Sequence, residues 1–379
     1  MEAQAVIDAL VAQPQGAAVL ELVGPRIAIV GGFVRDALRG VTPREIDLLV
    51  EGDVLPVAEQ LGGQITVHRP FLAAHVTRDG VSVELTQARR EYYARPGALP
   101  TVEPARLEED LPRRDFTVNA LAVELSSGAL LAPAGALDDL ARQRLRVFHE
   151  RSFIDDPTRV MRLARYRARL GFEVETDTAR LAQGASFDSV SGARIAAELR
   201  LALAEPDPLA ALEGLDAKLP LRLERGLVAG SLSLETLDAD DDLIVLAVIL
   251  GDAPPAWLDT LELTARERGV IDAAHRAREL ATATRRARSA SELRDVLCAL
   301  PAEAVAIIGA SGAEQAARRW LQELRHVKLE IGGEDLIAAG VPEGPELGAR
   351  LERTLRRKLD GELRGGRDAE LESALDGAP

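Results

Sequence analysis

Apolar and polar positions follow two different patterns along the chain. In the first third, short β-branched runs at 27–30, 48–50, 81–85 and 121–125 alternate with helical segments such as Val54–Leu61. Short apolar runs that alternate with helical segments predict a mixed α/β domain. From about Leu137 onward the strand pattern disappears, and Arg, Glu, Ala and Leu recur at helical spacing. The remainder is therefore predicted to be all-α.

Three breaks rich in Pro, Gly or acidic residues divide this helical part, at 205–208, 252–255 and 340–345. The pattern shows no repeat of fixed period, so a solenoid is not expected. With 379 residues and 47% hydrophobic content, the chain is long enough for two or three domains with buried cores. Aromatic residues make up only 3%, which favours helices packed by aliphatic side chains.

Charge and cysteine usage limit the classes of function. The net charge of −15 argues against coating of nucleic acid by bulk electrostatics, so any RNA site must be a local patch of cations. Arginine clusters at 276–288, 318–319 and 353–358 are candidates, but each can equally be a solvated helix face. The single cysteine, Cys298, cannot form an internal disulfide, which is typical of a reducing cytoplasm.

The sequence shows neither a signal peptide pattern at its start nor a membrane-spanning run. The first residues lack a basic start followed by an apolar stretch, and the longest apolar run, Leu243–Leu250, is too short to cross a bilayer. We therefore expect a cytoplasmic protein that is neither exported nor inserted in a membrane.

Two glycines, Gly31 and Gly32, end the first apolar run, and Arg35 and Asp36 follow in a helix-like segment. A glycine pair lets backbone N–H groups approach phosphate oxygens that side chains would otherwise block, and a helix start adds a positive dipole end. This order of residues suits a phosphate site. Taken alone, it favours a plain strand-to-helix turn over a phosphate site.

Carboxylates follow at Glu45 and Asp47, at the start of the next apolar run. In a strand, residues i and i+2 share a face, so these two would lie side by side, with Ile46 turned into the core. Such a pair can hold Mg²⁺ beside a triphosphate. Glu84 alternates with apolar neighbours in the run 81–85 and can complete the cluster if the two strands pair. The alternative is that all three are exposed strand residues.

The segment 108–121 places Arg113 and Arg114 next to Asp115, with Asn119 four residues later. Arginine forks bind phosphate oxygens, and an aspartate can accept a hydrogen bond from a ribose hydroxyl. A helix start capped by Asp110 or Asp115 explains one carboxylate but not the whole string.

A second polar string begins at Asp156-Pro157, which by itself is a good helix opening. Arg159 and Arg162 then lie three residues apart on one helical face. An aspartate acceptor beside an arginine donor can reproduce the pairing edge of a base.

Together these motifs resemble the class II tRNA nucleotidyltransferases, that is, CCA-adding enzymes and bacterial poly(A) polymerases. In that family GG-x-VRD precedes a D-x-D metal pair, and this chain departs from it by having Glu45 at the first position. Residues 113–120 resemble the RRDFTINA motif, and 155–162 resemble E-D-x-x-R-x-x-R, with Asp155 in place of Glu. The segment 331–348 resembles the family's Gly- and Pro-rich tail motif, and 194–199 its R-x-x-x-E-L helix, which buttresses the base-reading helix.

The resemblance implies an α+β head with a polymerase-β-like nucleotidyltransferase fold, followed by all-α neck, body and tail domains. We expect the head at 1–136, the neck at 137–204, the body at 205–310 and the tail, near the tRNA, at 311–379. The resemblance also implies roles for individual residues. Mg²⁺ would be held by Glu45 and Asp47, with Glu84 as a possible third ligand. Nucleotide contacts would come from Gly31, Gly32, Arg35, Asp36, Arg114, Asp115, Asn119, Asp156, Arg159 and Arg162.

The implied reaction is attack of a tRNA 3′-hydroxyl on the α-phosphate of ATP or CTP, with release of pyrophosphate. Alternatives remain open at this point. A partial enzyme that adds only CC or only A, and a poly(A) polymerase, share every motif named above. A nucleotidyltransferase acting on another substrate is disfavoured by the tail-like segment. A non-catalytic RNA-binding homologue is suggested by Glu45, although glutamate is still an oxygen ligand.

Overall fold

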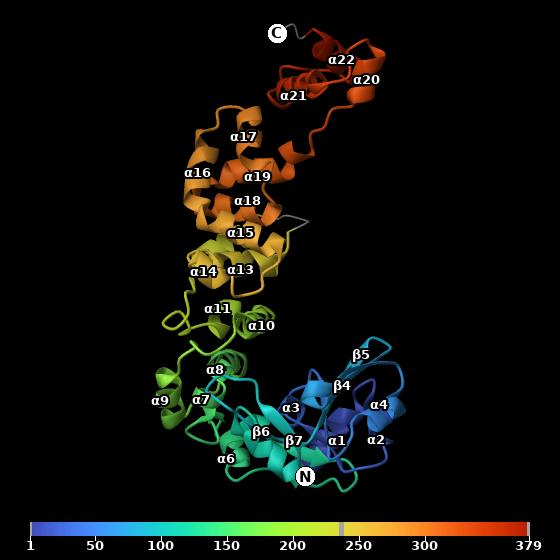
Figure 1. Cartoon of the computed structure of the whole chain (residues 1–379), viewed down its shortest axis with the longest axis vertical. Coiled ribbons are helices and arrows are strands. Elements are labelled where there is room, and N and C mark those ends of the chain that lie inside the picture. The colour runs from blue at the N-terminus through green and yellow to red at the C-terminus, as the bar shows by residue number, and fades with distance from the viewer. Residues whose placement is uncertain (1, 235–238, 377–379) are drawn as a thin grey trace. The chain divides into compact units, whose positions relative to one another are not determined.

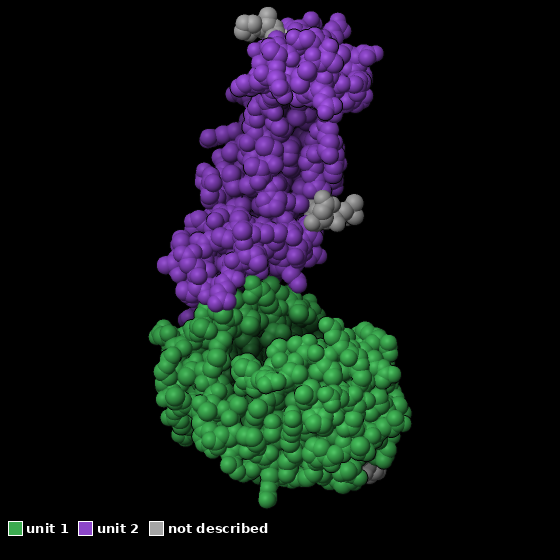
Figure 2. Space-filling model, turned by 45° about the vertical axis from the view of Figure 1, so that its right-hand side comes forward, with its two compact units in different colours: residues 1–214 green, residues 215–379 purple. Residues whose placement is uncertain are grey.

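The computed structural model describes residues 2–234 and 239–376, and it divides into two compact units, 1–214 and 215–379 (Figure 2). The first unit thus contains the predicted head and neck together and ends at Gly214, whereas the predicted neck ended at residue 204. The finer division into four domains stays a prediction.

The first unit is built on a seven-stranded mixed sheet. The strand order is β3 (Gln64–His68), β4 (Ala73–Arg78), β5 (Val81–Gln87), β2 (Ile46–Val50), β1 (Ile27–Val30), β8 (Ala122–Glu124) and β9 (Leu130–Leu131). All neighbours are antiparallel except β2 and β5, which are parallel. The four predicted strands are confirmed. Strands β3 and β4 were not predicted; β3 is an edge strand with mostly exposed residues.

One face of this sheet is covered by helices α1 (Glu2–Val11), α2 (Gly16–Leu20), α3 (Gly32–Leu38) and α4 (Leu55–Leu61) (Figure 1). Alternate strand residues such as Ile29, Leu48 and Leu85 point into this core and meet Phe33 and Val57 of the helices. The burial of these apolar side chains fixes the register of the strands, since a slip of one residue would turn them outward.

The second face of the sheet is divided in two. Over β1, β2 and β8, a smaller core joins Val30, Leu49 and Ala122 to Leu107 of helix α5 (Leu107–Asp110) and to Leu111 in a 3₁₀ turn, η2 (Leu111–Arg113). Beyond β2, over β5, β4 and β3, neither core cluster contributes residues on this face. The boundary between the apolar and the polar part runs along β2 and β5.

The rest of the first unit consists of short elements and helices. A ribbon of β6 (Arg89–Tyr92) and β7 (Thr101–Pro104) precedes α5, and a 3₁₀ turn, η3 (Thr117–Asn119), precedes β8. The helices that follow are α6 (Ala136–Ala141), α7 (Ser152–Asp155), α8 (Thr158–Leu170), α9 (Thr176–Gly184), α10 (Gly192–Leu203) and α11 (Pro208–Ala211). Two short strands, β10 (Arg144–Leu145) and β11 (Glu173–Val174), pair beyond Leu137, where only helices were expected, because two residues are too few to leave a pattern.

The second unit is helical throughout its described residues, as predicted. Its α-helices are α12 (Arg225–Leu232), α13 (Asp241–Leu250), α14 (Pro255–Leu258), α15 (Ala265–His275), α16 (Ala277–Arg286), α17 (Ala290–Leu297), α18 (Ala302–Ile308), α19 (Glu314–Gln322), α20 (Gly333–Ala338), α21 (Pro345–Leu359) and α22 (Arg367–Leu375). The apolar run 243–250 is the fully buried core of α13. Prolines 208, 255 and 345 of the predicted breaks each open a helix, where their missing N–H costs nothing.

Over residues 2–234 and 239–376, no single helix is long and apolar enough to cross a membrane. One pair of segments, 290–297 and 302–326, meets the length and composition test only jointly, across a bend of 113°.

Candidate active site

A cleft of about 430 Å³ opens in the first unit where the sheet meets helices α8 and α10. Ten of the predicted residues line it: Gly31, Gly32, Asp47, Glu84, Arg114, Asp115, Asn119, Asp156, Arg159 and Arg162. These residues are spread over more than 130 positions of the chain, so the fold brings them together. The lining does not include Arg35, Asp36 or Glu45.

Gly31 forms the sharp turn from β1 into α3. Its φ of 75° lies in the region that favours glycine. A Cβ at this position would lie 3.4 Å from Nη1 of Arg114 and 3.7 Å from Oδ2 of Asp47, so glycine also keeps the cleft open between them. The N–H of Gly31 donates to the carbonyl of Leu121 at 3.0 Å. The contribution of Gly31 is therefore space and backbone shape, and its N–H group is already bonded within the fold.

Asp47 and Glu84 face each other across the parallel pair of β2 and β5, in direct register. Burial and the neighbouring charge of Glu84 raise the pKa of Asp47 to about 6, with a smaller contribution from Glu45, while the charge of Arg114 opposes this shift. Like charges held together in this way favour a bound cation, which would relieve their repulsion.

Glu45 precedes β2 and is exposed, while Ile46 is buried as predicted. Among the described residues no group of three or more His, Cys, Asp or Glu side chains forms a metal cage. Mg²⁺ usually binds one or two carboxylates together with water and substrate phosphates, so the pair of Asp47 and Glu84 fits such an ion without a cage.

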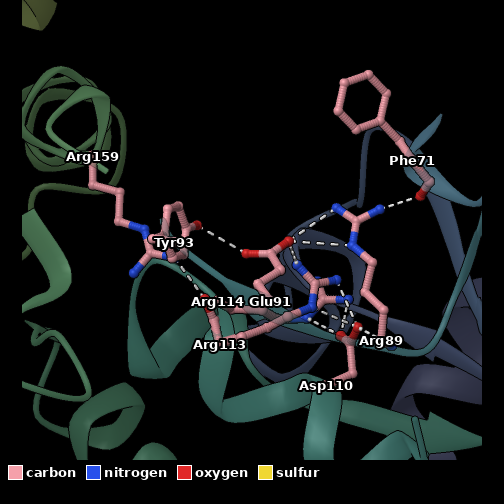
Figure 3. A network of polar contacts seen from close by, with 8 residues as sticks. All are labelled: Phe71, Arg89, Glu91, Tyr93, Asp110, Arg113, Arg114 and Arg159. Carbon is pink, nitrogen blue, oxygen red and sulfur yellow. Dashed lines mark hydrogen bonds and ion pairs between the residues drawn. The ribbon is translucent and has the colours of Figure 1, made fainter. Parts of the chain in front are cut away.

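A polar network that the sequence did not reveal lies on one side of the cleft (Figure 3). Asp110 is fully buried and binds the guanidinium groups of Arg113, at 2.6 Å, and Arg114, at 3.2 Å. Arg113 also pairs with Glu91 at 2.7 Å, and Glu91 accepts a hydrogen bond from the hydroxyl of Tyr93 at 3.0 Å. Burial, followed by the charge of Glu91, raises the pKa of the Tyr93 phenol. The network fixes both arginines at the cleft wall.

Sequence reasoning missed Glu91 and considered Asp110 only as a helix cap. The one available signal was the i, i+2 spacing of Arg89 and Glu91 in a short strand, which places them on one face. The pairing of Glu91 with Arg113 depends on a contact between distant segments, and no local pattern encodes it.

Asp115 is buried and acts as a brace between segments. It accepts hydrogen bonds from the N–H of Phe116 at 2.8 Å, from Nδ2 of Asn119 at 3.0 Å and from Nε of Arg162 at 2.8 Å. Although burial opposes the charged form, the charge of Arg162 is the main cause that holds the pKa of Asp115 below its usual range. These bonds join the turn at η3 to helix α8.

Arg35 and Asp36 lie beneath the cleft. Arg35 is 2% exposed, and it makes two hydrogen bonds of 2.8 Å to Asp36 and one of 2.6 Å to Oδ1 of Asn119. Its guanidinium also lies 5.6 Å from the centre of the Tyr166 ring. The structure therefore does not bring this arginine to the triphosphate position that the resemblance implied. Instead, its guanidinium holds the side chain of Asn119 through a hydrogen bond.

Asp156 and Arg159 stand at the start of helix α8, on the cleft wall. Asp156 accepts hydrogen bonds from the N–H of Thr158 at 3.0 Å and from Nη2 of Arg194 at 2.6 Å. Arg159 donates to Oγ of Ser152 at 2.7 Å and to the carbonyl of Arg113 at 2.6 Å. The structure thus gives this pair both a helix-opening role and a position from which to meet a ligand.

Helix α10 braces α8 through two separate contacts. Arg194 binds Asp156 and also donates to the carbonyl of Gly97 at 2.7 Å. Glu198 lies 3.7 Å from Arg165 and 4.0 Å from Arg162. Arg194 and Glu198 therefore each contact other segments, and this fits the buttress that the resemblance implied.

Within the second unit, several residues of the arginine clusters are engaged in ion pairs. Arg276 pairs with Glu279, Arg318 with Glu314, and Arg356 with Asp295. The first two pairs join residues three or four apart in the chain and are exposed, which is consistent with solvated helix faces, whereas the third joins α21 to α17.

Comparisons with known proteins agree with this architecture. Residues 27–146 match the family model of the poly A polymerase head domain. The A-adding tRNA nucleotidyltransferase of Geobacter sulfurreducens is 34% identical over an alignment that covers 91% of this chain and 44% of that protein. The CCA-adding enzyme of Limosilactobacillus fermentum is 30% identical and is covered over 91% of both chains.

A solved structure of the Thermotoga maritima CCA-adding enzyme in complex with tRNA superposes with a TM-score of 0.70 and 26% identity. It covers 96% of this chain and 98% of that one. The chain spans about half the length, or less, of several curated A-adding relatives. The match to the Limosilactobacillus enzyme, in contrast, runs over nearly the full length of both proteins. This chain therefore belongs to the family of tRNA nucleotidyltransferases and poly(A) polymerases that includes the CCA-adding enzymes.

Proposed function

We propose that this protein is a tRNA nucleotidyltransferase that adds C, A or both to the 3′ end of tRNA, with CTP and ATP as donors. The observation that carries this proposal is the cleft itself. It combines a carboxylate pair, Asp47 and Glu84, with a guanidinium suited to phosphate, Arg114, and a carboxylate and guanidinium suited to the edge of a base, Asp156 and Arg159. The names of the relatives support the same activity.

In this reaction the 3′-hydroxyl oxygen forms a bond to the α-phosphorus of the nucleotide and loses its proton. The bond from the α-phosphorus to the bridging oxygen breaks, and pyrophosphate leaves with that oxygen. Catalysis of this kind depends on positioning and on neutralisation of charge. A divalent cation, proposed here to be Mg²⁺, would supply that neutralisation when bound.

The residues of the chain bind and orient the substrates. Asp47 and Glu84 would hold the cation, and Glu45, two residues before Asp47, is a further candidate ligand. Arg114 is fixed by Asp110 at the edge of the cleft and would contact the triphosphate. Asn119, held by Arg35 and Asp115, would face the sugar.

Base selection would fall to Asp156 and Arg159. An acceptor and a donor held at a fixed spacing can reproduce a pairing edge. Both residues are anchored by other contacts, to Arg194 in one case and to Ser152 in the other, and this limits their movement. A pairing edge held in place in this way binds a base whose donors and acceptors match it. It rejects a base in which donors and acceptors are exchanged.

The test uses the purified chain and a tRNA that ends before CCA, incubated with CTP and ATP separately and together. The product length on a gel distinguishes addition of CCA, of CC, of a single A and of a poly(A) run. Asp47→Ala should abolish incorporation while tRNA binding persists. Glu59→Ala, which changes an exposed carboxylate on α4, should leave incorporation unchanged. Incorporation by Asp47→Ala at the wild-type rate would contradict the metal assignment.

The same assay tests a second candidate, a non-catalytic RNA-binding homologue. That reading is favoured by Glu45, which replaces aspartate and lies outside the lining of the cleft. A chain that binds tRNA and extends it with no nucleotide, in either Mg²⁺ or Mn²⁺, would establish it in place of the enzyme.

A further inference from the structure

A row of polar side chains crosses the open part of the head sheet. Residues directly opposed in neighbouring strands share a face. The register places Thr66 of β3 opposite His75 of β4, His75 opposite Glu84 of β5, and Glu84 opposite Asp47 of β2. The row therefore leads from the edge of the sheet directly to the candidate metal carboxylates.

A shallow groove follows this row and borders on the cleft. It is lined by Thr66, His68, Ala73, His75 and Glu84, together with Ala74. Glu84 also lines the cleft, so one carboxylate belongs to both cavities. Phe71 lines the cleft as well, and it lies in a 3₁₀ turn, η1 (Arg69–Phe71), between the groove residues 68 and 73. The groove and the cleft thus share Glu84, and Phe71 of the cleft lies close in the chain to the groove residues His68 and Ala73.

The order of strands assigns the two cavities to two substrates. Arg114 lies beside Gly31 at the end of β1, on one side of Asp47, whereas β5, β4 and β3 lie on the other side. In phosphoryl transfer the attacking and leaving oxygens lie roughly in line on opposite sides of phosphorus. If the triphosphate occupies the side with Arg114, the attacking hydroxyl must approach from the groove.

Phe71 has the properties of a stacking platform. Its side chain is 42% exposed, which is unusual for a large aromatic group, while its backbone carbonyl accepts a hydrogen bond from the guanidinium of Arg89. The next residue, Leu72, has a φ of 52°, and its carbonyl accepts a hydrogen bond from the N–H of Gln87 at 2.8 Å. The backbone is thus fixed while the ring stays exposed. Figure 3 shows the Phe71 ring pointing away from the guanidinium of Arg89.

The side chains of the groove suit the backbone of RNA. Imidazole and hydroxyl groups, as in His75 and Thr66, hydrogen-bond to phosphate and to the ribose 2′-hydroxyl, and an exposed aromatic ring accepts any base by stacking. We propose that this groove binds the 3′-terminal nucleotide of the RNA primer, with its base stacked on Phe71 and its backbone beside His75. The inference rests on the proposed function, because it takes the cleft as the nucleotide site.

The test measures stacking directly. A tRNA that ends before CCA carries 2-aminopurine as its terminal base, and the fluorescence of this base falls when it stacks on an aromatic ring. We expect the wild-type protein to quench this fluorescence, Phe71→Ala to lose most of the quenching and Phe71→Tyr to retain it. Val67→Ala is the matched control, because Val67 is 41% exposed on the opposite face of β3 and should quench like the wild type.

Steady-state kinetics then separate positioning from general damage. Phe71→Ala should raise KM for tRNA about tenfold, as expected for the loss of one base stack, and leave KM for the nucleotide unchanged. His75→Ala should also raise KM for tRNA, with the quenching largely kept, because the ring of Phe71 remains.

Two outcomes would overturn the inference. The first is undiminished quenching by Phe71→Ala, and the second is an equal rise in KM for tRNA in Phe71→Ala and Val67→Ala. Failure of the proposed function looks different, since a wild-type protein that quenches the fluorescence but adds no nucleotide would refute the activity and leave the groove assignment standing. A protein that extends tRNA but does not quench the fluorescence would refute the groove assignment and leave the proposed activity standing.

Discussion

Replacement of Asp110 by asparagine should destabilise the first unit, and the structure gives the size of the effect. The Asp110 carboxylate is fully buried, yet it faces two guanidinium groups. It accepts hydrogen bonds from Arg113 at 2.8 Å and from Arg114 at 3.3 Å, and also from the N–H of Arg89 at 3.2 Å. Asparagine keeps the shape of the side chain but removes the charge that both arginines neutralise.

The expected loss is about 3 kcal/mol. Hydrogen bonds to charged groups contribute roughly 1.5–3 kcal/mol each, so two of them set an upper range of about 3–6 kcal/mol. Part of this free energy is recovered, because Arg113 keeps its ion pair with Glu91. In addition, the side chains of Arg113 and Arg114 are 17% and 19% exposed, so water can solvate them. The remaining Arg114 loses its tether, so KM for the nucleotide should rise as well.

Hydrogen–deuterium exchange followed by mass spectrometry measures this loss locally. Peptides that cover 107–121 should exchange about 100-fold faster in Asp110→Asn, which corresponds to about 3 kcal/mol. The control is Glu108→Gln, which removes an exposed carboxylate paired with Arg26 and should cost only about 0–1 kcal/mol. If both variants exchange at the wild-type rate, the buried charge does not hold the two arginines as argued.

Three further predictions concern the cleft. Arg159→Ala should lower discrimination against GTP and UTP by about tenfold, and lower tRNA affinity less, because this guanidinium supplies part of the base-reading edge; competition assays with mixed nucleotides measure both. Glu45→Asp should keep or raise activity if the longer side chain reaches the metal imperfectly, and Mn²⁺ should support the wild type at least as well as Mg²⁺; a strong loss of activity would mean that the site is built around glutamate. Because the pKa of Asp47 is raised to about 6, protons should compete with the metal below that value. Mn²⁺ affinity, followed by electron paramagnetic resonance, should therefore rise between pH 5 and pH 7, and Asp47→Asn should remove most of this dependence.

Much of the fold and of the candidate site follows from local patterns. The strands at 27–30, 46–50, 81–87 and 122–124 carry apolar runs, and the glycine turn at Gly31 and the helix opening at Asp156-Pro157 have local signatures. These features depend on residues close together in the chain, so a pattern of a few residues can encode them. Strands β3, β4, β6, β7, β9, β10 and β11 were not predicted. Strands β9, β10 and β11 are only two residues long, and β3 is an edge strand with mostly exposed residues.

Candidate residues were found by motif, but their positions were decided by tertiary contacts. Arg35 and Arg114 are both arginines next to an aspartate in the sequence, yet one is buried against Asn119 and the other lines the cleft. Local sequence cannot distinguish them, because burial is decided by segments more than 80 residues away.

The sequence by itself thus determined the mixed head, the helical remainder and the set of residue types needed for nucleotidyl transfer. Only the tertiary structure decided that Asp47 opposes Glu84, that Asp110 and Glu91 fix the arginines, and that a polar groove continues from the cleft across β3, β4 and β5. The physical reason is that strand pairing and ion pairing join segments far apart in the chain. Their energy depends on geometry that exists only once the sheet has formed.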